Sequence, residues 1–252
     1  GGVGTLATCL RGYSADAAII IEPTEMMIAP AQAGALNFRI HVPGHAAHGA
    51  LRTEGVSAIE KFMPLYQAIM AYEAQRTATI KDDRFAAYAI PYPICVGTIH
   101  GGNWASTVAE SLTFEGRFGI AGGEDSAEAK QKFVDMVMAA ADKDDFLRVN
   151  RPKVTWWGGQ FDSAGIDPTH PIVTTTSTAY EQISGSPAIQ QGMPYGADMR
   201  LLIHHAHTPT IMFGPGDVRK AHQPDEYVPL ADLETVTRTL TLTILRFLGI
   251  KQ

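Results

Sequence analysis

The sequence has little cysteine, little charge and no long apolar run, and each shortage argues against a class of protein. Its two cysteines, Cys9 and Cys95, stand in an apolar helical pattern and in a strand-like run, with no CxxC spacing. This pattern indicates reduced core residues and not a disulfide framework. No apolar run approaches the roughly 20 residues of a membrane helix, and no signal-peptide pattern is present. We therefore expect a cytoplasmic protein without a membrane partner.

Basic residues are also scarce. Lys and Arg total 20 against 26 Asp and Glu, which gives a formal net charge of -6. This balance argues against nucleic acid as the main partner and favours small molecules. With 252 residues, 45% of them hydrophobic, the chain has room for one large or two small cores. We expect two domains.

Two predicted strands are followed by residues that could act in catalysis or metal binding. Residues 16–21 form an apolar strand that gives way to Glu22, and residues 209–213 form a second apolar run. The glycines of residues 214–216 then force a turn into a loop that carries His222. In open α/β sheets, the loops beyond the carboxyl ends of the strands form the ligand crevice. Glu22 and His222 are therefore candidates for one site.

The central part of the chain has a different pattern. Alternating or helical apolar spacing predicts, in order, a strand, a helix, two strands, a helix and a strand; these cover residues 35–42, 53–75, 94–100, 111–120, 125–141 and 151–157. Pro64 lies inside the first helix, so we expect a kink or a late start there. The order predicts a ferredoxin-like module, with an antiparallel sheet and both helices on one face.

The α/β pattern stands on both sides of this module. Helices are expected over residues 2–10, 171–184 and 230–248, and a short strand over residues 188–191. We therefore predict an α/β domain in two segments, residues 1–33 and 158–252, with residues 34–157 inserted between them. The exposed helix and edge strand of the inserted module could pair with a second copy of the chain.

Carboxylate and imidazole are ligands that zinc, cobalt and manganese accept. Glu22 and His222 are thus a candidate metal pair, the alternative being a helix-capping acid and a solvated loop histidine. The spacing of His204, His205 and His207 could also bind a metal. These three residues precede the strand at 209, however, and so lie at the end away from the crevice.

Several motifs resemble those of the M20 metallopeptidase family, and they occur in family order. Residues 213–228 (FGPGDVRKAHQPDEYV) are similar to its closing motif, and residues 21–24 (IEPT) to its second carboxylate motif. Residues 44–49 (GHAAHG), followed by 54–59 (EGVSAI), are similar to the start of its lid domain. Residues 195–200 (YGADMR) resemble its substrate-facing segment.

The resemblance implies two divalent metal ions, zinc first, with cobalt or manganese as alternatives. Glu22 would bind one ion and His222 the other, and a metal-bound water would attack an amide carbonyl. His48 would be the catalytic lid histidine, which reaches the site of a second subunit and stabilises the oxyanion. Its alternative is an ordinary loop histidine. A homodimer through residues 34–157 is the expected assembly.

The resemblance also assigns substrate contacts. Arg200 would pair with a substrate carboxylate, the alternative being a surface ion pair with Asp198 or another acid. Where relatives carry Asp-x-Arg, this chain reads Arg117-Phe118-Gly119. Arg117 lies on the same strand face as the missing arginine and could replace it. The remaining substrate-binding residues would be Asn103, Ser106 and Gly214.

The predicted function is that of a metal-dependent hydrolase which cleaves the amide bond of an N-acyl amino acid. One alternative is a dipeptidase or carboxypeptidase of the same family. Another is a non-catalytic dimerisation or ligand-binding protein that has lost the metal centre. The resemblance places the other ligands and the general base before Gly1. The expected fold is thus an incomplete zinc-hydrolase-like α/β catalytic domain with an inserted ferredoxin-like α+β lid and dimerisation domain, inactive by itself.

Overall fold

A computed structural model describes residues 2–249, which divide into two compact units. Unit 1 comprises residues 2–34, 82–89 and 161–249 of this range, and unit 2 comprises residues 35–81 and 90–160. The chain thus passes between units after residues 34, 81, 89 and 160. The sequence pattern places residues 82–89 inside the central module, whereas in the structure they belong to unit 1. Gly1 lies outside the described residues.

Unit 2 has the predicted β-α-β-β-α-β order. Its elements are β3 (Gly34–Pro43), α2 (Ala58–Thr79), β4 (Ile94–Gly101), β5 (Ser111–Ile120), α3 (Ser126–Ala141) and β6 (Lys153–Phe161). The strands form one sheet in the order β4-β5-β3-β6, and β4 and β5 are antiparallel. Helix α2 begins after Ser57, whose hydroxyl accepts a hydrogen bond from the Glu60 amide, and it continues through Pro64. The expectation of a late start at Pro64 is therefore wrong.

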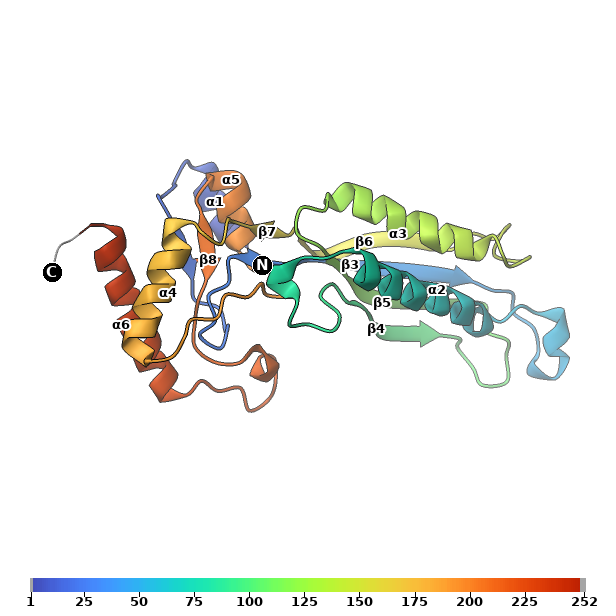
Figure 1. The fold of residues 1–252 in the computed structure, drawn as a ribbon. Coiled ribbons are helices and arrows are strands. Elements are labelled where there is room, and N and C mark those ends of the chain that lie inside the picture. The colour runs from blue at the N-terminus through green and yellow to red at the C-terminus, as the bar shows by residue number, and fades with distance from the viewer. Residues whose placement is uncertain (1, 250–252) are drawn as a thin grey trace. The chain divides into compact units, whose positions relative to one another are not determined.

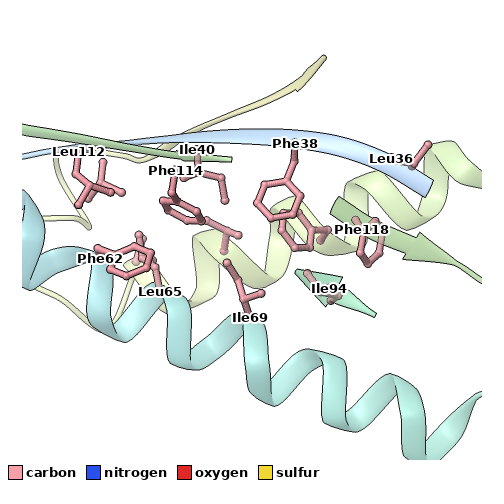
Figure 2. Packing of buried hydrophobic residues seen from close by; sticks show 14 of the residues in the cluster. Leu36, Phe38, Ile40, Phe62, Leu65, Ile69, Ile94, Leu112, Phe114 and Phe118 are labelled. Atoms are coloured by element: carbon pink, nitrogen blue, oxygen red, sulfur yellow. The ribbon is translucent and has the colours of Figure 1, made fainter. Parts of the chain in front are cut away.

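One face of this sheet carries the core of unit 2. Alternate residues of β3, from Leu36 to Val42, are buried, and they pack with the buried faces of α2 and α3. Figure 2 shows Phe38 and Phe114 of the strands pointing toward Leu65 and Ile69 of α2. Because a strand alternates its side chains, the residues between these point to the opposite face. Both helices therefore cover the same face, as predicted.

Unit 1 is built from shorter strands and more helix. It contains α1 (Val3–Leu10), β1 (Ala18–Ile20), β2 (Ala31–Gln32), β7 (Ala164–Gly165), α4 (Pro171–Ser184), α5 (Met199–Ala206), β8 (Thr210–Met212) and α6 (Leu230–Phe247). Strands β1 and β8 are parallel, and β2 and β7 are antiparallel. Helices α4 and α6 lie side by side (Figure 1). The strand predicted over 188–191 forms only an isolated bridge from Gln190 to Ile28.

Residues 82–89 are held in unit 1 by an aromatic anchor. They include the short 3-10 helix η2 (Asp83–Phe85), and the Phe85 side chain is fully buried. Its ring fills the space above Gly192, where an added Cβ would lie 2.5 Å from it. The Gly192 amide also donates a hydrogen bond to the Arg84 carbonyl oxygen (2.7 Å). A glycine at 192 is thus needed for this packing.

The two cysteines differ in environment. Both are free, and Cys9 is buried in α1 as predicted. Cys95 is exposed, so its assignment to the core is wrong. It lies on the edge strand β4, opposite Arg117, while its neighbour Ile94 points into the core. Among residues 2–249, no helix is both long and apolar enough to span a membrane.

Candidate functional site

The pairing of β1 with β8 brings two of the predicted site segments together in unit 1. Ile20 lies opposite Met212, so Glu22 and Gly214 follow adjacent strand ends. The Thr24 hydroxyl accepts a hydrogen bond from the Gly214 amide (3.0 Å) and donates one to the Gly214 carbonyl oxygen (3.3 Å). A Cβ on Gly214 would collide with the Glu22 carbonyl oxygen. Gly214 therefore allows the two loops to meet.

Main-chain hydrogen bonds extend this contact. The Glu25 amide donates to the Gly216 carbonyl oxygen (2.9 Å), and the Met26 amide donates to the Gly214 carbonyl oxygen (3.0 Å). Glu25 and Met26 have left-handed φ angles of 55° and 62°, and His222 in the facing loop has 62°. Such angles are uncommon outside glycine and cluster at functional sites. Three of these residues within two paired loops support a site here.

The Glu22 carboxyl is half-buried. Burial raises its pKa, and the nearby Asp198 carboxylate raises it further. The Tyr195 hydroxyl donates a hydrogen bond to the Pro23 carbonyl oxygen (3.1 Å), and burial together with the Glu22 charge raises the pKa of this phenol. Neither Tyr195 nor Asp198 is among the site residues predicted from the sequence. Both stand in the YGADMR motif, but only tertiary structure shows that they adjoin Glu22.

His222 lies in the exposed part of its loop, after the 3-10 helix η3 (Val218–Lys220). Its amide donates a hydrogen bond to Glu226 Oε2 (3.3 Å). A pocket of about 350 Å³ is lined by residues of both loops, among them Pro23, Gly216 and Glu226. Across the described residues, no three His, Cys, Asp or Glu side chains gather closely enough to hold a metal ion. His204, which was considered as a metal ligand, donates a hydrogen bond from Nε2 to the Ser163 carbonyl oxygen (2.9 Å).

Arg200 is buried rather than exposed. Its Nη1 donates to the Ala197 carbonyl oxygen (2.6 Å), and its guanidinium carbon lies 4.2 Å from the centre of the Phe161 ring. Burial lowers its pKa, while Asp198, whose Oδ1 lies 3.8 Å away, acts in the opposite direction. Asp198 accepts a hydrogen bond from Thr5 Oγ1 (2.6 Å). The ion pair with Asp198 that was the predicted alternative is therefore present, but Arg200 is buried and not at the surface.

Unit 2 holds a second group of predicted site residues. The main chain of His48 forms an antiparallel bridge with Thr107, and the Gly49 amide donates to the Ser106 carbonyl oxygen (2.7 Å). His48 and Ser106 are thus neighbours, and both are exposed. Asn103 is exposed in the same connection between β4 and β5. The ring of His48 accepts a hydrogen bond at Nδ1 from the Ala50 amide (3.1 Å).

Arg117 stands on β5, opposite Cys95. Burial lowers the pKa of its guanidinium, and Cys95 acts in the opposite direction. Two residues further on, a Cβ at Gly119 would lie 2.6 Å from the carbonyl carbon of Tyr92. The space that an arginine side chain would need at position 119 is therefore occupied by backbone. This explains in steric terms why position 119 is glycine here.

Comparison with known proteins gives a family assignment for part of the chain. Residues 31–145 match the M20 peptidase dimerisation domain. The N-formyl-4-amino-5-aminomethyl-2-methylpyrimidine deformylase of Bacillus subtilis (strain 168) is 26% identical over 261 residues, covering 95% of this chain and 60% of the deformylase. The acetylornithine deacetylase of Edwardsiella ictaluri (strain 93-146) is 28% identical over 236 residues, covering 89% of this chain and 55% of that enzyme.

Solved structures share the fold. A tripeptidase from Staphylococcus aureus superposes with a TM-score of 0.67 at 18% identity, covering 95% of this chain and 58% of the tripeptidase. The dipeptidase Dug1p from Saccharomyces cerevisiae gives a TM-score of 0.68 at 8% identity, covering 95% of this chain and 59% of Dug1p. The chain thus spans 55–60% of the length of these four proteins.

Proposed function

Because the chain belongs to the M20 peptidase family, we propose that it acts in a hydrolase that cleaves the amide bond of an N-acyl amino acid. The observation that carries this proposal is the pairing of β1 with β8. It places Glu22 and the loop of His222 at one edge of the sheet, where α/β enzymes collect their catalytic groups. The deacetylase and deformylase relatives both act on small N-acyl compounds, which favours a deacylase.

Glu22 and His222 are the predicted ligands of two divalent ions, zinc or else cobalt or manganese. Their oxygen and nitrogen donors suit these ions. A catalytic zinc site takes three protein ligands, however, and the described residues contain no cluster of that size. These residues do not complete a metal centre by themselves. We therefore propose that residues 1–252 alone are inactive, and we assign no catalytic step to an ion here.

The other predicted residues act on the substrate in this proposal. His48 donates a hydrogen bond to the oxyanion that forms when water attacks the amide. Arg117 binds a substrate carboxylate, and Asn103 and Ser106, in the connection between β4 and β5, contact the substrate. Arg200 and Gly214 keep their predicted substrate roles, although the buried contacts of both also position the 195–200 and 214–216 segments.

Hydrolysis assays test this proposal. The protein as encoded by its natural gene is incubated with zinc or cobalt and N-acetylornithine, N-succinyl-diaminopimelate, an N-formyl aminopyrimidine or dipeptides. Release of the free amine from an N-acyl compound is the expected result. Release from dipeptides alone would favour the dipeptidase or carboxypeptidase alternative. No hydrolysis of any compound, together with no bound metal, would favour a non-catalytic binding protein.

We also propose a homodimer through unit 2. Three large apolar side chains on one side of α2 are exposed, Ile59 by 49%, Met63 by 52% and Tyr66 by 36%. The adjacent strand β4 is a sheet edge without lysine or proline to block pairing, and Ile99 on it is 47% exposed. A second copy would cover both. A cytoplasmic location stays a prediction.

Sedimentation velocity tests this assembly. Met63→Glu places a charge in the apolar stripe and should shift the protein from dimer to monomer. The control, Lys132→Glu, changes an exposed residue of α3 that lies outside the stripe and should leave the dimer intact. A Met63→Glu protein that sediments like the unchanged dimer would contradict the proposal.

A further inference from the structure

We infer that the main-chain amide of Ala50 fixes the tautomer and orientation of the His48 ring, so that Nε2 presents its hydrogen to an anionic oxygen. Ala50 is thus a positioning residue for the predicted lid histidine. This inference deepens the proposed function and rests on it for the identity of the oxyanion. The ring geometry itself does not depend on any activity.

The hydrogen bond between Ala50 and His48 has only one possible direction. A backbone amide can only donate, so Nδ1 of His48, 3.1 Å from the Ala50 nitrogen, must be the acceptor. A ring nitrogen that accepts carries no hydrogen, and a neutral imidazole then carries its hydrogen on Nε2. By contrast, His41 Nδ1 lies 3.4 Å from the Thr113 hydroxyl, a partner that can donate or accept. The His48 contact fixes the tautomer, as does the matching bond from the Ile172 amide to His170 Nδ1 (3.3 Å).

The backbone around His48 holds the ring in place. His48 is the N-cap of the 3-10 helix η1 (Gly49–Glu54), with φ -63° and ψ 135°. Its carbonyl oxygen accepts from the Leu51 amide (2.8 Å), and the neighbouring Ala47 carbonyl oxygen accepts from the Val108 amide (2.9 Å). These contacts fix the chain on both sides of the ring. The Ala50 bond then restricts rotation of the ring itself.

The remaining ring nitrogen is available to a ligand. Among the hydrogen bonds within residues 2–249, none involves Nε2 of His48, and the residue is exposed. An Nε2–H donor that is already oriented can bind a developing oxyanion without first reorganising, which is what makes such donors effective. The same donor could bind a carboxylate, so the shared ligand chemistry is an anionic oxygen.

Nitrogen-15 NMR of the histidine rings tests the inference on the protein as it stands. Spectra are recorded at about pH 8.5, where an ordinary imidazole is neutral. His48→Asn identifies the His48 signals by their loss, and its side-chain oxygen can still accept from Ala50. The expected result is an unprotonated Nδ1 signal, far downfield, and a protonated Nε2. A protonated Nδ1 would overturn the inference.

Ala50→Pro removes the donor, since proline has no amide hydrogen, and an early helical position tolerates it. The His48 Nδ1 signal should then move upfield as the other tautomer becomes populated. Ala50→Gly keeps the amide and should leave the signal in place. Tryptophan fluorescence checks that both variants fold. If Ala50→Pro is folded and its Nδ1 signal is unchanged, the amide does not set the tautomer.

The oxyanion role has a separate readout. In a hydrolytically active protein, His48→Asn should lower kcat by about 100-fold with little change in KM, because the shorter side chain keeps the cap but loses the Nε2–H donor at the oxyanion position. Ala50→Pro should lower kcat by about 10-fold, as expected for a supporting contact. The predicted tautomer in a protein that hydrolyses nothing would defeat the proposed function and leave the Ala50 inference standing. An active protein with a protonated Nδ1 would support the proposed function and overturn the Ala50 inference.

Discussion

Unit 2 gathers its apolar residues in one continuous core, whereas unit 1 divides them between two smaller clusters. The core of unit 2 draws on four strands and two helices. One cluster of unit 1 includes Phe213 and the other includes Met212, which lies in the two-stranded parallel sheet. A hollow of about 450 Å³ remains between β1 and α6, lined mainly by apolar residues that include Ile19, Leu240 and Phe247. The two units therefore differ in how completely they bury their own apolar surface.

The two units also fix the loops that carry their candidate site residues by different contacts. The His48 loop of unit 2 stands at the end of a well-packed sheet, and a few main-chain bonds suffice to fix it. The Glu22 loop of unit 1 depends on direct bonding to the 214–216 segment, with Thr24 at the centre. In unit 2, the free energy of unfolding should therefore depend mainly on residues of the core. In unit 1, it should depend on residues of the two paired loops.

The largest expected effect is in the core of unit 2. Phe114→Ala should lower the free energy of unfolding by about 3–5 kcal/mol, because it removes a fully buried ring from a close-packed cluster. Urea denaturation followed by tryptophan fluorescence measures this, since Trp104, Trp156 and Trp157 all lie in unit 2. Phe213→Ala is the matched change in unit 1 and should affect this signal less. An equal or larger effect from Phe213→Ala would contradict the larger contribution assigned to the core of unit 2.

A smaller effect is expected from Thr24→Val. The change keeps the side-chain shape but removes both hydrogen bonds to Gly214, and it leaves the buried Gly214 amide without this partner. The expected cost is about 1–3 kcal/mol, measured by thermal unfolding. Thr24→Ser retains the hydroxyl and should cost less. Equal stability of the valine variant and the native protein would show that other contacts hold the loops together.

Much of the fold could be predicted because it depends on local spacing. The predicted bounds of β5 and α4 coincide with the observed ones, since alternation and helical periodicity run the full length of these elements. Residues 82–89 could not be placed, because the site that receives Phe85 is made by Gly192, more than 100 residues away. Likewise, only the burial pattern of an edge strand shows that Cys95 is exposed.

The candidate site could be predicted in part for the same reason. Glu22 and His222 follow recognisable strands, so their loops could be placed at one sheet edge. The burial of Arg200 under Phe161 depends on a contact between distant segments and has no local sequence signal. The roles of Tyr195 and Asp198 beside Glu22 were missed for the same reason.

A still smaller effect on the free energy of unfolding is expected from the ionisation of Asp144. Burial alone would raise the pKa of Asp144, but hydrogen bonds from Lys61 Nζ (2.6 Å) and from two backbone amides outweigh it and lower that pKa. The folded state then holds this proton less tightly than the unfolded state does. The stabilisation is present above the ordinary carboxyl pKa and is lost as pH falls through the lowered one.

Asp144→Asn tests this sign. The variant should be less stable than the native protein by about 1 kcal/mol near neutral pH, and the gap should close as the pH falls below about 4. Chemical denaturation at a series of pH values measures the gap. A stability difference that widens as the pH falls would contradict the lowered pKa of Asp144.

The smallest effect on stability is expected at the hollow of unit 1. Ile244→Glu adds a charge at a position that is 54% exposed on its rim, and it should change the free energy of unfolding by less than about 0.5 kcal/mol. It should nonetheless reduce binding of an apolar fluorescent dye, because the hollow becomes less apolar. Thr237→Glu, at an exposed α6 position that does not line the hollow, is the control. Unchanged dye binding in Ile244→Glu would show that the hollow is not the apolar surface that distinguishes unit 1.

The most direct test of the proposed function is amide hydrolysis by the natural protein with and without His222. With zinc or cobalt present, we predict release of the free amine from at least one N-acyl amino acid. His222→Ala should lower this rate by at least about 100-fold while leaving the tryptophan fluorescence of unit 2 unchanged. Hydrolysis at the same rate in both proteins would contradict the assignment of His222. Absence of hydrolysis in the native protein would contradict the proposed function itself.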